Sequence, residues 1–458
     1  MYEIAPRSST GRRRAAARAP RRLARRLGAV GPRLALVVAA AVVAVIAVGA
    51  ALNILLPERA FDSYLGAPHP PFLWLWRPRI DPLAAVALPA FALGVGQAPR
   101  LLDARLKAPT FAVAVFGLAL ALRLGLAAAR EGPSGWYAAF DTGFNAGNEY
   151  LPSLPSLELG LTAFLDRFDQ LAPTLSVHPS AHPPGMVVTL HLLEIDGVVA
   201  MAWLVILAGT LAAPLTYVLG RRLLDERRAR LAALLFACSP SALIYGVSSA
   251  DALFVTLGLA AAIALVTDHR LVAVVLGPAL LALAAFFSYA LLALGAWAVL
   301  LRLRLRGALD AARLVLASAA GLALACGGLY VATGFDSLGG LAAADDAYRA
   351  SIAAVRPYAY WVFGSPAAFI VALGIPIAWY ATRAVSERHP AALALAAIVL
   401  VAALGGFSKA ETERVWLFMV PLACVAAAYV LPSRKLPAIL AALALQAFAT
   451  ELLFETIW

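Results

Sequence analysis

The sequence predicts an all-α, polytopic membrane protein, and two observations lead to this prediction. Hydrophobic residues make up 62% of the 458 residues, and charged residues make up only 14%, against about 25% in an average soluble domain. Apolar runs of close to the roughly 20 residues that cross a bilayer also recur along most of the chain. We therefore expect a bundle of transmembrane helices.

The N-terminal residues 1–33 hold most of the positive charge. They carry ten arginines and one acidic residue, Glu3, and so account for +9 of the formal net charge of +11. We interpret them as a disordered cytoplasmic arm that touches anionic headgroups, and we expect no nucleic-acid partner. The next apolar run, 34–56, is longer than the roughly 7–15-residue core of a signal peptide, so it predicts a retained first transmembrane helix.

The remaining apolar runs predict about thirteen spans in one membrane domain, 34–458. The expected spans are 34–56, 82–98, 108–128, 197–219, 230–249, 251–267, 271–286, 288–302, 312–332, 365–382, 390–407, 414–431 and 436–453. Two of them, 271–286 and 288–302, are short, and they form either one bent helix or a buried pair joined at 286–289.

The charge of the connections predicts how the chain is oriented. Positive charge is found at 100–107, 221–230, 268–270, 302–313, 382–389 and 433–435, on the side of the N-terminal arm. Most acidic residues fall on the other side, at 57–81, 129–196, 248–251, 334–365 and 408–413. Because cytoplasmic loops are enriched in Lys and Arg, we expect a plasma-membrane protein whose N-terminus is cytoplasmic and whose acidic segments lie outside.

The large outer loop 129–196 is the candidate site. An irregular polar segment has to lie outside the hydrocarbon or in a protein-lined cavity. Glycine and asparagine around Asp141 and Glu149 permit tight turns that would present a carboxylate. Apolar residues at 157, 161, 164, 165 and 168 predict an amphipathic helix on the membrane surface.

The order of motifs between residues 141 and 260 resembles the C-type (GT-C) membrane glycosyltransferases. An acidic outer loop is followed by HPPGMVVTLHLLE at 182–194, by GRRLL at 220–224, and by ARLAALLFACSP and YGVSSADALFVTLGLA within 229–260. The protein O-mannosyltransferase and lipid A aminoarabinose transferase branch is the most similar. The resemblance implies a GT-C-like bundle that moves a sugar from a polyprenyl-phosphate donor to a lipid, glycan or protein acceptor on the outer face.

The resemblance also implies that one acidic residue of this loop is the general base. An acceptor hydroxyl that attacks an anomeric carbon needs a proton acceptor, and a partly desolvated carboxylate supplies one. The family often has Asp-Glu-Tyr, whereas this chain has Asn148-Glu149-Tyr150. Either Asp141 or Glu149 is therefore the expected base, with Asp141 slightly preferred, and Tyr150 is an expected substrate contact. The alternative is that both carboxylates only cap turns.

His178, His182 and Asp251 are further candidates for substrate contacts. The two histidines stand four residues apart, a metal-ligand spacing on a helix, but prolines at 179, 183 and 184 argue against a regular helix. We expect a structural or substrate-contact role, with metal ligation as the less favoured alternative, and no other cofactor. Asp251 either caps a helix or lines the cavity.

The segment 408–417 and Tyr358 complete the predicted site. Lys409, Glu411, Glu413 and Arg414 open a late span, and Arg414 is the preferred phosphate ligand because guanidinium binds phosphate in a bidentate manner. An interfacial arginine that snorkels beside Trp416 is the alternative. Tyr358 either stacks on a sugar or belongs to an interfacial aromatic belt.

Two other classes of function stay open. The sequence contains no GxxxxGK[ST] phosphate loop, HExxH, GxSxG or dinucleotide fingerprint, which argues against nucleotide-driven transport. A secondary transporter of a small solute is one alternative, because broken helices and buried charges also build transporters. A non-catalytic, lipid-binding relative of the enzymes is the other.

Overall fold

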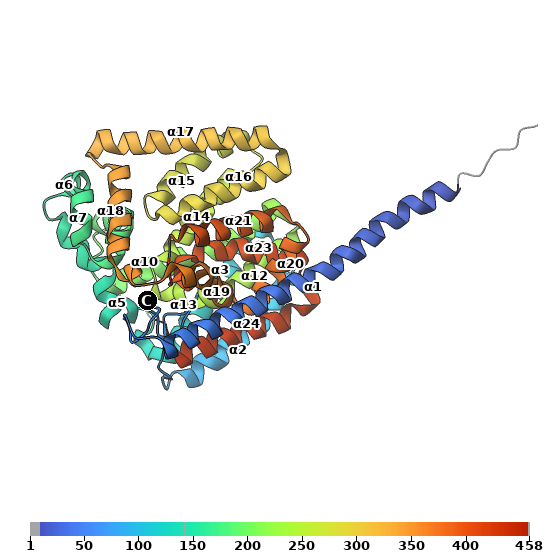
Figure 1. Ribbon diagram of the computed structural model, residues 1–458, viewed down its shortest axis with the longest axis horizontal. Helices are drawn as coiled ribbons and strands as arrows, with labels where there is room; N and C mark the ends of the chain where they lie inside the picture. Colours follow the sequence, from blue (N-terminus) through green and yellow to red (C-terminus); the bar gives the residue numbers. More distant parts are fainter. Residues whose placement is uncertain (1–9, 142, 457–458) are drawn as a thin grey trace, which may run out of the picture.

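The computed structural model describes residues 10–141 and 143–456, with side chains for 32–141 and 145–456. Most of this chain is helical (Figure 1). The exception among the named elements is a two-stranded antiparallel sheet, β1 (Trp74–Trp76) with β2 (Phe454–Thr456), in which Trp74 pairs with Thr456. The fold is therefore all-α, as the composition predicts.

The helices follow one another with short connections, apart from 56–83, which holds β1. In the first half they are α1 (Thr10–Leu55), α2 (Ala84–Asp103), α3 (Ala108–Glu131), α4 (Ala138–Asp141), α5 (Gly143–Asn148), α6 (Leu161–Asp166), α7 (Phe168–Leu171), α8 (Val177–Ala181), α9 (Gly185–Leu192), α10 (Val198–Thr210), α11 (Ala212–Leu223) and α12 (Glu226–Ala237). In the second half they are α13 (Pro240–Ser248), α14 (Asp251–Val266), α15 (Gly277–Ala285), α16 (Leu292–Arg306), α17 (Ala308–Thr333), α18 (Ser337–Ala350), α19 (Tyr358–Leu373), α20 (Ile375–Ser386), α21 (Pro390–Gly405), α22 (Thr412–Val415), α23 (Val420–Val430) and α24 (Leu436–Leu453).

Every expected span falls on helix, but fewer helices meet the length and hydropathy of a full crossing. Within the described residues seven do so, or nine if the bent pairs α12–α13 and α19–α20 each count as one span. The apolar helices α14 and α21 have 16 residues each, about 24 Å at 1.5 Å per residue, which is less than the hydrocarbon thickness of about 30 Å. The chain is thus a multi-pass membrane protein, and the thirteen-span count is not confirmed.

Helix α1 differs from the predicted disordered arm. It begins at Thr10, so helix extends through most of 1–33, while residues 1–9 lie outside the described part. Alanine, arginine and leucine, which dominate 10–30, have among the highest helix propensities, and a composition-based expectation of disorder does not weigh this.

Helices α15 and α16 form a hairpin, which decides between the two readings of 271–302. A Cβ atom at Gly277, where α15 begins, would lie 2.8 Å from the Leu265 side chain at the end of α14. Arg302, near the end of α16, donates hydrogen bonds to the carbonyls of Leu265 and Thr267. Both outer ends therefore meet the same end of α14, and the chain reverses at 286–289.

Helices α19 and α20 belong to one expected span, 365–382, but bend by 114° at Gly374. This glycine has a φ of +106°, a conformation that other residues rarely adopt. The bend frees backbone groups that water cannot reach in a bilayer. Gln446 of α24 binds two of them, since its Oε1 accepts from the Ile375 N–H and its Nε2 donates to the Val371 carbonyl.

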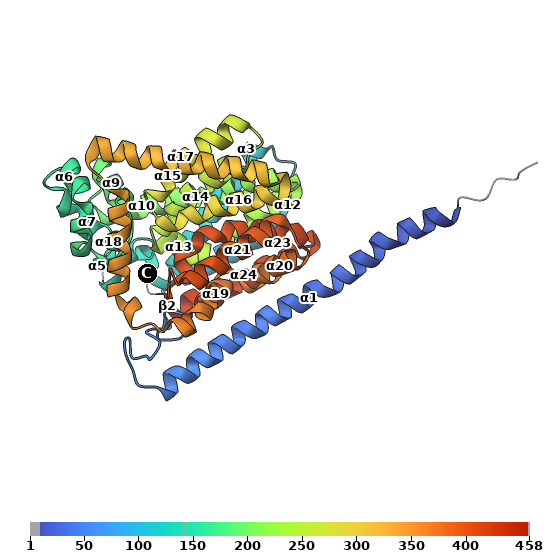
Figure 2. The ribbon, with the colours of Figure 1, turned by 45° about the horizontal axis from the view of Figure 1, so that its top comes forward.

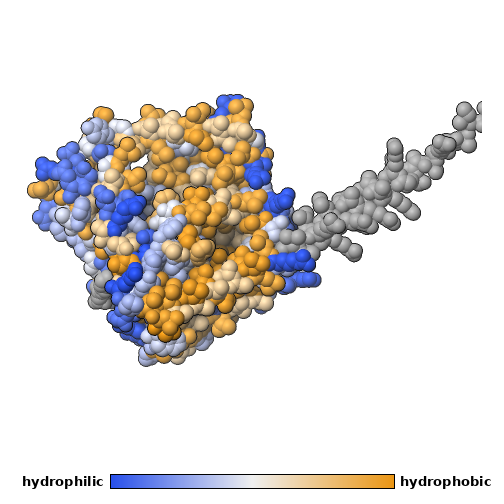
Figure 3. Space-filling view, in the orientation of Figure 1, coloured by the Kyte–Doolittle hydropathy of each residue, from blue (hydrophilic) through white to orange (hydrophobic). Residues whose placement is uncertain are grey.

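The surface of the bundle is banded by hydropathy. Figure 3 shows hydrophobic residues across the middle of one face and hydrophilic residues toward its two edges, around α5–α7 and α18 at one and at the other where α1 leaves the bundle. Only 6% of the apolar stretch of α17 is buried, whereas 83% of the apolar stretch within Thr412–Val430 is buried. An apolar belt between polar ends fits a bilayer.

The acidic outer segments gather at one end of the bundle, which we call the loop end. It lies opposite the Thr10 end of α1, and α5–α7, α18 and β2 lie there (Figures 1 and 2). At the opposite end the basic connections contact one another, as in the ion pairs Arg227–Asp103 and Arg306–Asp268. The structure therefore separates the two sets of connections as the charge pattern predicts.

The amphipathic stretch 157–168 differs from the expected surface helix. Gly160, with a φ of +98°, breaks it ahead of α6. Phe164, Leu165 and Phe168 are buried in the protein core and do not face lipid. The periodicity correctly indicates one buried face, but it does not specify whether protein or membrane covers that face.

Candidate functional site

The His-Pro-Pro-Gly sequence forms a tight corner at the loop end. Helix α8 stops at His182, whose φ of −123° and ψ of 157° are extended, and α9 begins at Gly185. The Gly185 N–H donates to the Phe286 carbonyl at 2.9 Å. A Cβ atom at Gly185 would lie 2.3 Å from that oxygen, so only glycine fits without movement of the α15–α16 turn.

This corner places both histidines inside the protein. The His182 ring lies 5.6 Å from the Phe254 ring of α14, measured between centroids. His178 is buried and stacks near Tyr150, with a centroid distance of 6.2 Å and an interplanar angle of 23°. The two imidazoles thus share an aromatic-lined environment with Tyr150 and Phe254.

Glu149 lies against this corner. Its backbone carbonyl accepts a hydrogen bond from the Ser176 hydroxyl, which ties the end of α5 to the start of α8. Its Oε1 atom lies 3.6 Å from Nε2 of His178, and the side chains are 2% and 6% exposed. Its Oε2 atom is buried and has no hydrogen-bond partner within the described residues. A buried carboxylate oxygen without a partner is costly and is often functional.

Burial shifts the pKa values of this group in opposite directions. It raises the pKa of Glu149 to about 8, with Asp251 acting in the same direction and the positive charge of Arg414 opposing them. Burial lowers the pKa of His178 well below its usual value, and the charge of Arg414 lowers it further. At neutral pH, therefore, His178 is neutral and Glu149 titrates within reach of physiological pH.

A network of buried ions lies next to Glu149 and is centred on Glu411. Its Oε1 accepts from Arg356 at 3.1 Å, and its Oε2 accepts from Arg414 at 3.1 Å. Arg414 also donates to Asp251 at 2.8 Å, at the first turn of α14. Both arginine side chains are at most 5% exposed. This network joins the segments 408–414, 248–251 and 334–365.

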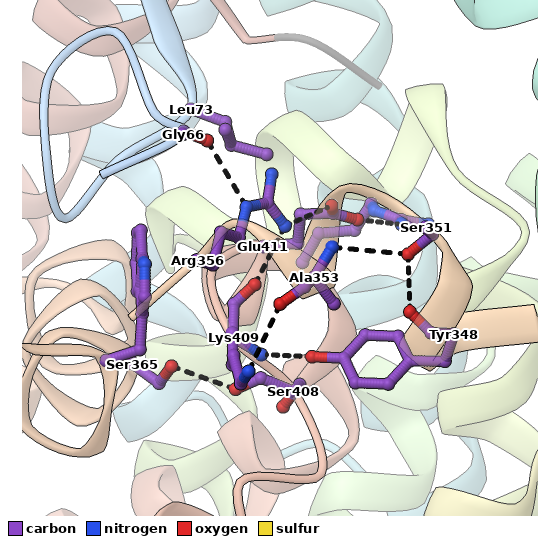
Figure 4. Close-up of polar contacts among 12 residues, drawn as sticks. Gly66, Leu73, Tyr348, Ser351, Ala353, Arg356, Ser365, Ser408, Lys409 and Glu411 are labelled. Atoms are coloured by element: carbon purple, nitrogen blue, oxygen red, sulfur yellow. Dashed lines mark hydrogen bonds and ion pairs between the residues drawn. The ribbon is translucent and has the colours of Figure 1, made fainter. Parts of the chain in front are cut away.

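Arg356 connects the network to the loop 57–81 and binds the segment 408–414 a second time (Figure 4). Its Nε donates to the Gly66 carbonyl at 3.2 Å, and its Nη1 donates to the Lys409 carbonyl at 2.8 Å. Lys409 itself donates from its backbone N–H to the Tyr348 hydroxyl and from Nζ to the Ala353 carbonyl. The loop 57–81, the end of α18 and the segment before α22 are thereby held together.

Glu413 anchors the loop 57–81 from the other side. Its Oε1 accepts from the Leu73 N–H at 3.1 Å, while its Oε2 is buried without a hydrogen-bond partner in the parts of the chain that the structure describes. The adjacent Trp74 donates from its indole to the Tyr245 hydroxyl of α13 at 2.9 Å.

Most of the residues that the sequence singles out meet at the loop end, but two do not. The residues brought together are Glu149, Tyr150, His178, His182, Asp251, Lys409, Glu411, Glu413 and Arg414. Asp141 is exposed at the end of α4, and within the described residues no contact places it beside the others. Tyr358 is 45% exposed and donates to the Leu404 carbonyl, so it lies on the outer surface between α19 and α21.

Arg356 is the main residue that the site prediction lacks. In the sequence it is one arginine of a polar outer loop, and only its position before Pro357 and the aromatic run 358–363 marks it. Its importance comes from long-range contacts, with partners 290 residues earlier and 55 residues later. No local pattern encodes such contacts.

The arrangement offers acid–base chemistry and charge, with Glu149 as the group that titrates near neutral pH and His178 as its neutral neighbour. Among the described residues, no three His, Cys, Asp or Glu side chains lie close enough together to hold a metal ion. Comparisons of the chain with protein-family models, curated proteins and solved structures found no match.

Proposed function

We propose that this chain is a membrane glycosyltransferase with a GT-C-like architecture, with Glu149 as the general base. The proposal depends on one observation: the Glu149 carboxyl is buried beside neutral His178, with a raised pKa and one oxygen that lacks a hydrogen-bond partner within the described residues. That oxygen is available to accept a proton from a substrate. The order of motifs between 141 and 260 supports the same assignment.

The proposed reaction is an attack of an acceptor hydroxyl on the anomeric carbon of a lipid-linked sugar. The acceptor oxygen forms the new bond to this carbon and gives its proton to Glu149. The bond between the anomeric carbon and the phosphate oxygen breaks, and polyprenyl phosphate leaves with the electron pair. Glu149 has to be ionised before the step, and the positive charge of Arg414 favours that state.

The network around Arg414 has a supporting role in this proposal. Both Asp251 and Glu411 already bind its guanidinium group. Arg414 therefore contributes positive charge to the site, but a donor phosphate would have to compete with two carboxylates for its hydrogen bonds. Asp251, Glu411 and Glu413 hold Arg414 and the surrounding loops in place, and His178, His182 and Tyr150 form the wall around Glu149.

The membrane orientation is part of the proposal. The basic connections lie opposite the loop end, so the positive-inside rule places the loop end outside and the N-terminus in the cytoplasm. A plasma membrane with a lipid-linked sugar on its outer face is the matching location. The thirteen-span arrangement would add the short helices α14, α15, α16 and α21 to the nine longer crossings.

A donor panel tests this function directly. Purified full-length protein in lipid nanodiscs would be incubated with radiolabelled polyprenyl-phosphate sugars, with and without acceptor lipids, glycans or peptides. We expect transfer or slow hydrolysis of at least one donor, and loss of this activity in Glu149→Gln. If no donor binds or turns over with the wild-type protein, the glycosyltransferase assignment fails. Donor binding without any turnover in the wild type would instead favour a non-catalytic lipid-binding protein.

Secondary transport is the second candidate, because one observation favours it. Arg123 lies buried within the α3 span and donates to Thr210, where α10 gives way to α11. A buried intramembrane charge beside a helix break is a feature of transporter binding sites. Proton- or sodium-coupled uptake into proteoliposomes that is lost in Arg123→Gln but retained in Glu149→Gln would decide for this class.

A further inference from the structure

An apolar groove runs along the membrane face of the protein between α1 and α19. It has a volume of about 380 Å³, and Val45, Val48 and Leu52 of α1 face Tyr360 and Phe363 of α19 across it. The α1 side of the lining runs from Ala44 to Leu56, which is about 18 Å at 1.5 Å per residue. The groove therefore extends along α1.

Specific contacts between the two helices shape this groove. Helix α1 touches α19 closely at Gly49, where a Cβ atom would lie 2.2 Å from the Tyr360 hydroxyl. That hydroxyl also donates to the Val45 carbonyl at 3.3 Å. Helix α1 also packs against α20, and only 17% of the apolar stretch within Pro32–Leu55 is buried. The close approach at Gly49 fixes the separation of the walls on either side of it.

The open side of the groove faces the hydrocarbon of the membrane. Val48 is 51% exposed and Phe363 is 64% exposed, and both belong to the lining. In a bilayer such a surface is covered by lipid chains, because water is absent at that depth. The occupant is therefore a hydrocarbon chain.

A cation marks the loop end of the groove. Tyr64 belongs to the lining, and the Arg59 guanidinium lies 4.2 Å above the Tyr64 ring and donates to its hydroxyl at 3.2 Å. Arg59 is exposed, and no carboxylate of the described residues lies within ion-pair distance of it. Glu58 and Asp62 are exposed in the same loop. Arginine binds phosphate with planar, paired donors, which suits a lipid headgroup at this depth.

The groove borders the segment 65–66, which the buried ion network holds. Leu65, which lines the groove, accepts a hydrogen bond at its carbonyl from the Trp361 indole. The next carbonyl, that of Gly66, accepts from Arg356. A ligand in the groove therefore lies against the same short segment that the ion network holds.

We propose that this groove binds the isoprenoid chain of a polyprenyl phosphate, with the phosphate at Arg59. This inference rests on the proposed function only in the identity of the lipid as the sugar carrier. It assigns the phosphate to Arg59, whereas the sequence favours Arg414. The N–H groups of Arg414 already donate to Asp251 and Glu411. A single flexible chain matches a groove that is bounded by two helices along its length.

Lipid binding without any sugar tests the inference separately from catalysis. Full-length protein in nanodiscs of zwitterionic phosphatidylcholine would be photolabelled with a diazirine-bearing polyprenyl phosphate. Val48→Trp fills the groove, and its control is Val43→Trp, a residue of α1 that is 65% exposed and lies outside the lining. Arg59→Gln removes the cation, and its control is Arg349→Gln, whose side chain is 73% exposed. We expect labelling to fall about tenfold in both groove variants and to stay within about twofold of wild type in both controls.

The outcomes separate the two proposals. If wild-type protein is labelled on α1 or α19 but turns over no donor, the lipid site stands and the glycosyltransferase assignment fails. If Arg59→Gln and Val48→Trp bind and turn over a donor like wild type, the lipid site is wrong and the enzyme assignment stands. Equal displacement of the label by phosphatidylglycerol would overturn the choice of a polyprenyl lipid. Arg59→Gln changes an exposed side chain, so it remains informative if Val48→Trp does not fold.

Discussion

The Oε1 atom of Glu149 lies 3.6 Å from the Nε2 atom of His178, and both side chains are buried. The distance is too long for a direct hydrogen bond. Burial raises the pKa of Glu149 and lowers that of His178, so the neutral forms of both residues are favoured. The two groups are therefore neutral neighbours and do not form a salt bridge. The activity and the stability of the protein should depend on the pH at which Glu149 loses its proton.

Replacing the carboxylate should abolish transfer. In Glu149→Gln the proton acceptor is lost while the shape of the side chain is kept, so we expect the rate of sugar transfer to fall by about 10²–10⁴-fold. Donor binding should change little. Asp141→Asn is the matched control, because Asp141 is exposed and contacts none of the described site residues, and it should retain the wild-type rate. Equal losses in both variants would refute the assignment of Glu149.

The rate should rise with pH. Because burial raises the pKa of Glu149 to about 8, its ionised fraction increases from about one tenth at pH 7 to about nine tenths at pH 9. The initial rate at saturating donor should follow this fraction and increase about tenfold over the same range. A rate that is flat or falls between pH 7 and 9 would show that a different group accepts the proton.

The same carboxyl should make the stability depend on pH. In the unfolded chain Glu149 titrates near its ordinary value of 4.5, and in the folded protein it titrates near 8. Between these values the folded state holds the extra proton, so the free energy of unfolding falls as the pH rises. Glu149→Gln removes this dependence, and at pH 8 it should be more stable than wild type by on the order of a few kcal/mol. Thermal unfolding at pH 5 and pH 8 measures the difference, which should be small at pH 5.

Removing Arg356 should destabilise the loop end. Its guanidinium binds Glu411 and two backbone carbonyls and is 2% exposed. Arg356→Gln would leave these acceptors buried without a donor, and we expect a loss of about 3–5 kcal/mol in the free energy of unfolding. Arg349→Gln breaks an exposed ion pair with Asp345 instead, and it should leave the melting temperature unchanged. Similar melting temperatures for the two variants would contradict the central role of Arg356.

A methyl group at Gly185 should displace the histidine corner. The added Cβ atom would lie 2.3 Å from the Phe286 carbonyl oxygen, so α9 or the α15–α16 turn has to move. We expect Gly185→Ala to cost about 1–3 kcal/mol of stability and to reduce transfer through the displaced His178 and His182. Gly197→Ala is the control, because a Cβ atom there meets nothing within 4 Å. The measurements are the melting temperature and the transfer rate of each variant.

The sequence predicts the fold class and the two-sided distribution of loops well, because both follow from composition and charge. The positions of the helices also follow, since each expected span coincides with helix. The bend at Gly374 and the break at Gly160 are less predictable. A glycine permits a positive φ, but whether the chain adopts it depends on distant partners such as Gln446.

The candidate site is predictable in its residue types and less so in its geometry. Histidine, carboxylate and arginine residues in outer segments indicate that charges meet there, but the choice between Asp141 and Glu149 requires knowledge of burial. Both lie in turns rich in glycine and asparagine, and only the structure shows that one is exposed and the other buried. Arg356 lies outside the prediction because its partners are far away in the chain.

The two oxygens of Glu411 are each bound to a different arginine, and this has a consequence for how a substrate reaches Glu149. On that side of the site, Arg356 and Arg414 link the segment 408–414 to 57–81, 248–251 and 334–365. Opening it would break several of these buried contacts together. The side formed by α8 and Tyr150 is held by hydroxyl hydrogen bonds, by aromatic packing and by contacts with α18, which give way at lower cost than ion pairs. Under the proposed function, an acceptor should therefore enter by displacement of α8, while the side of the site that contains Arg356 and Arg414 stays in place.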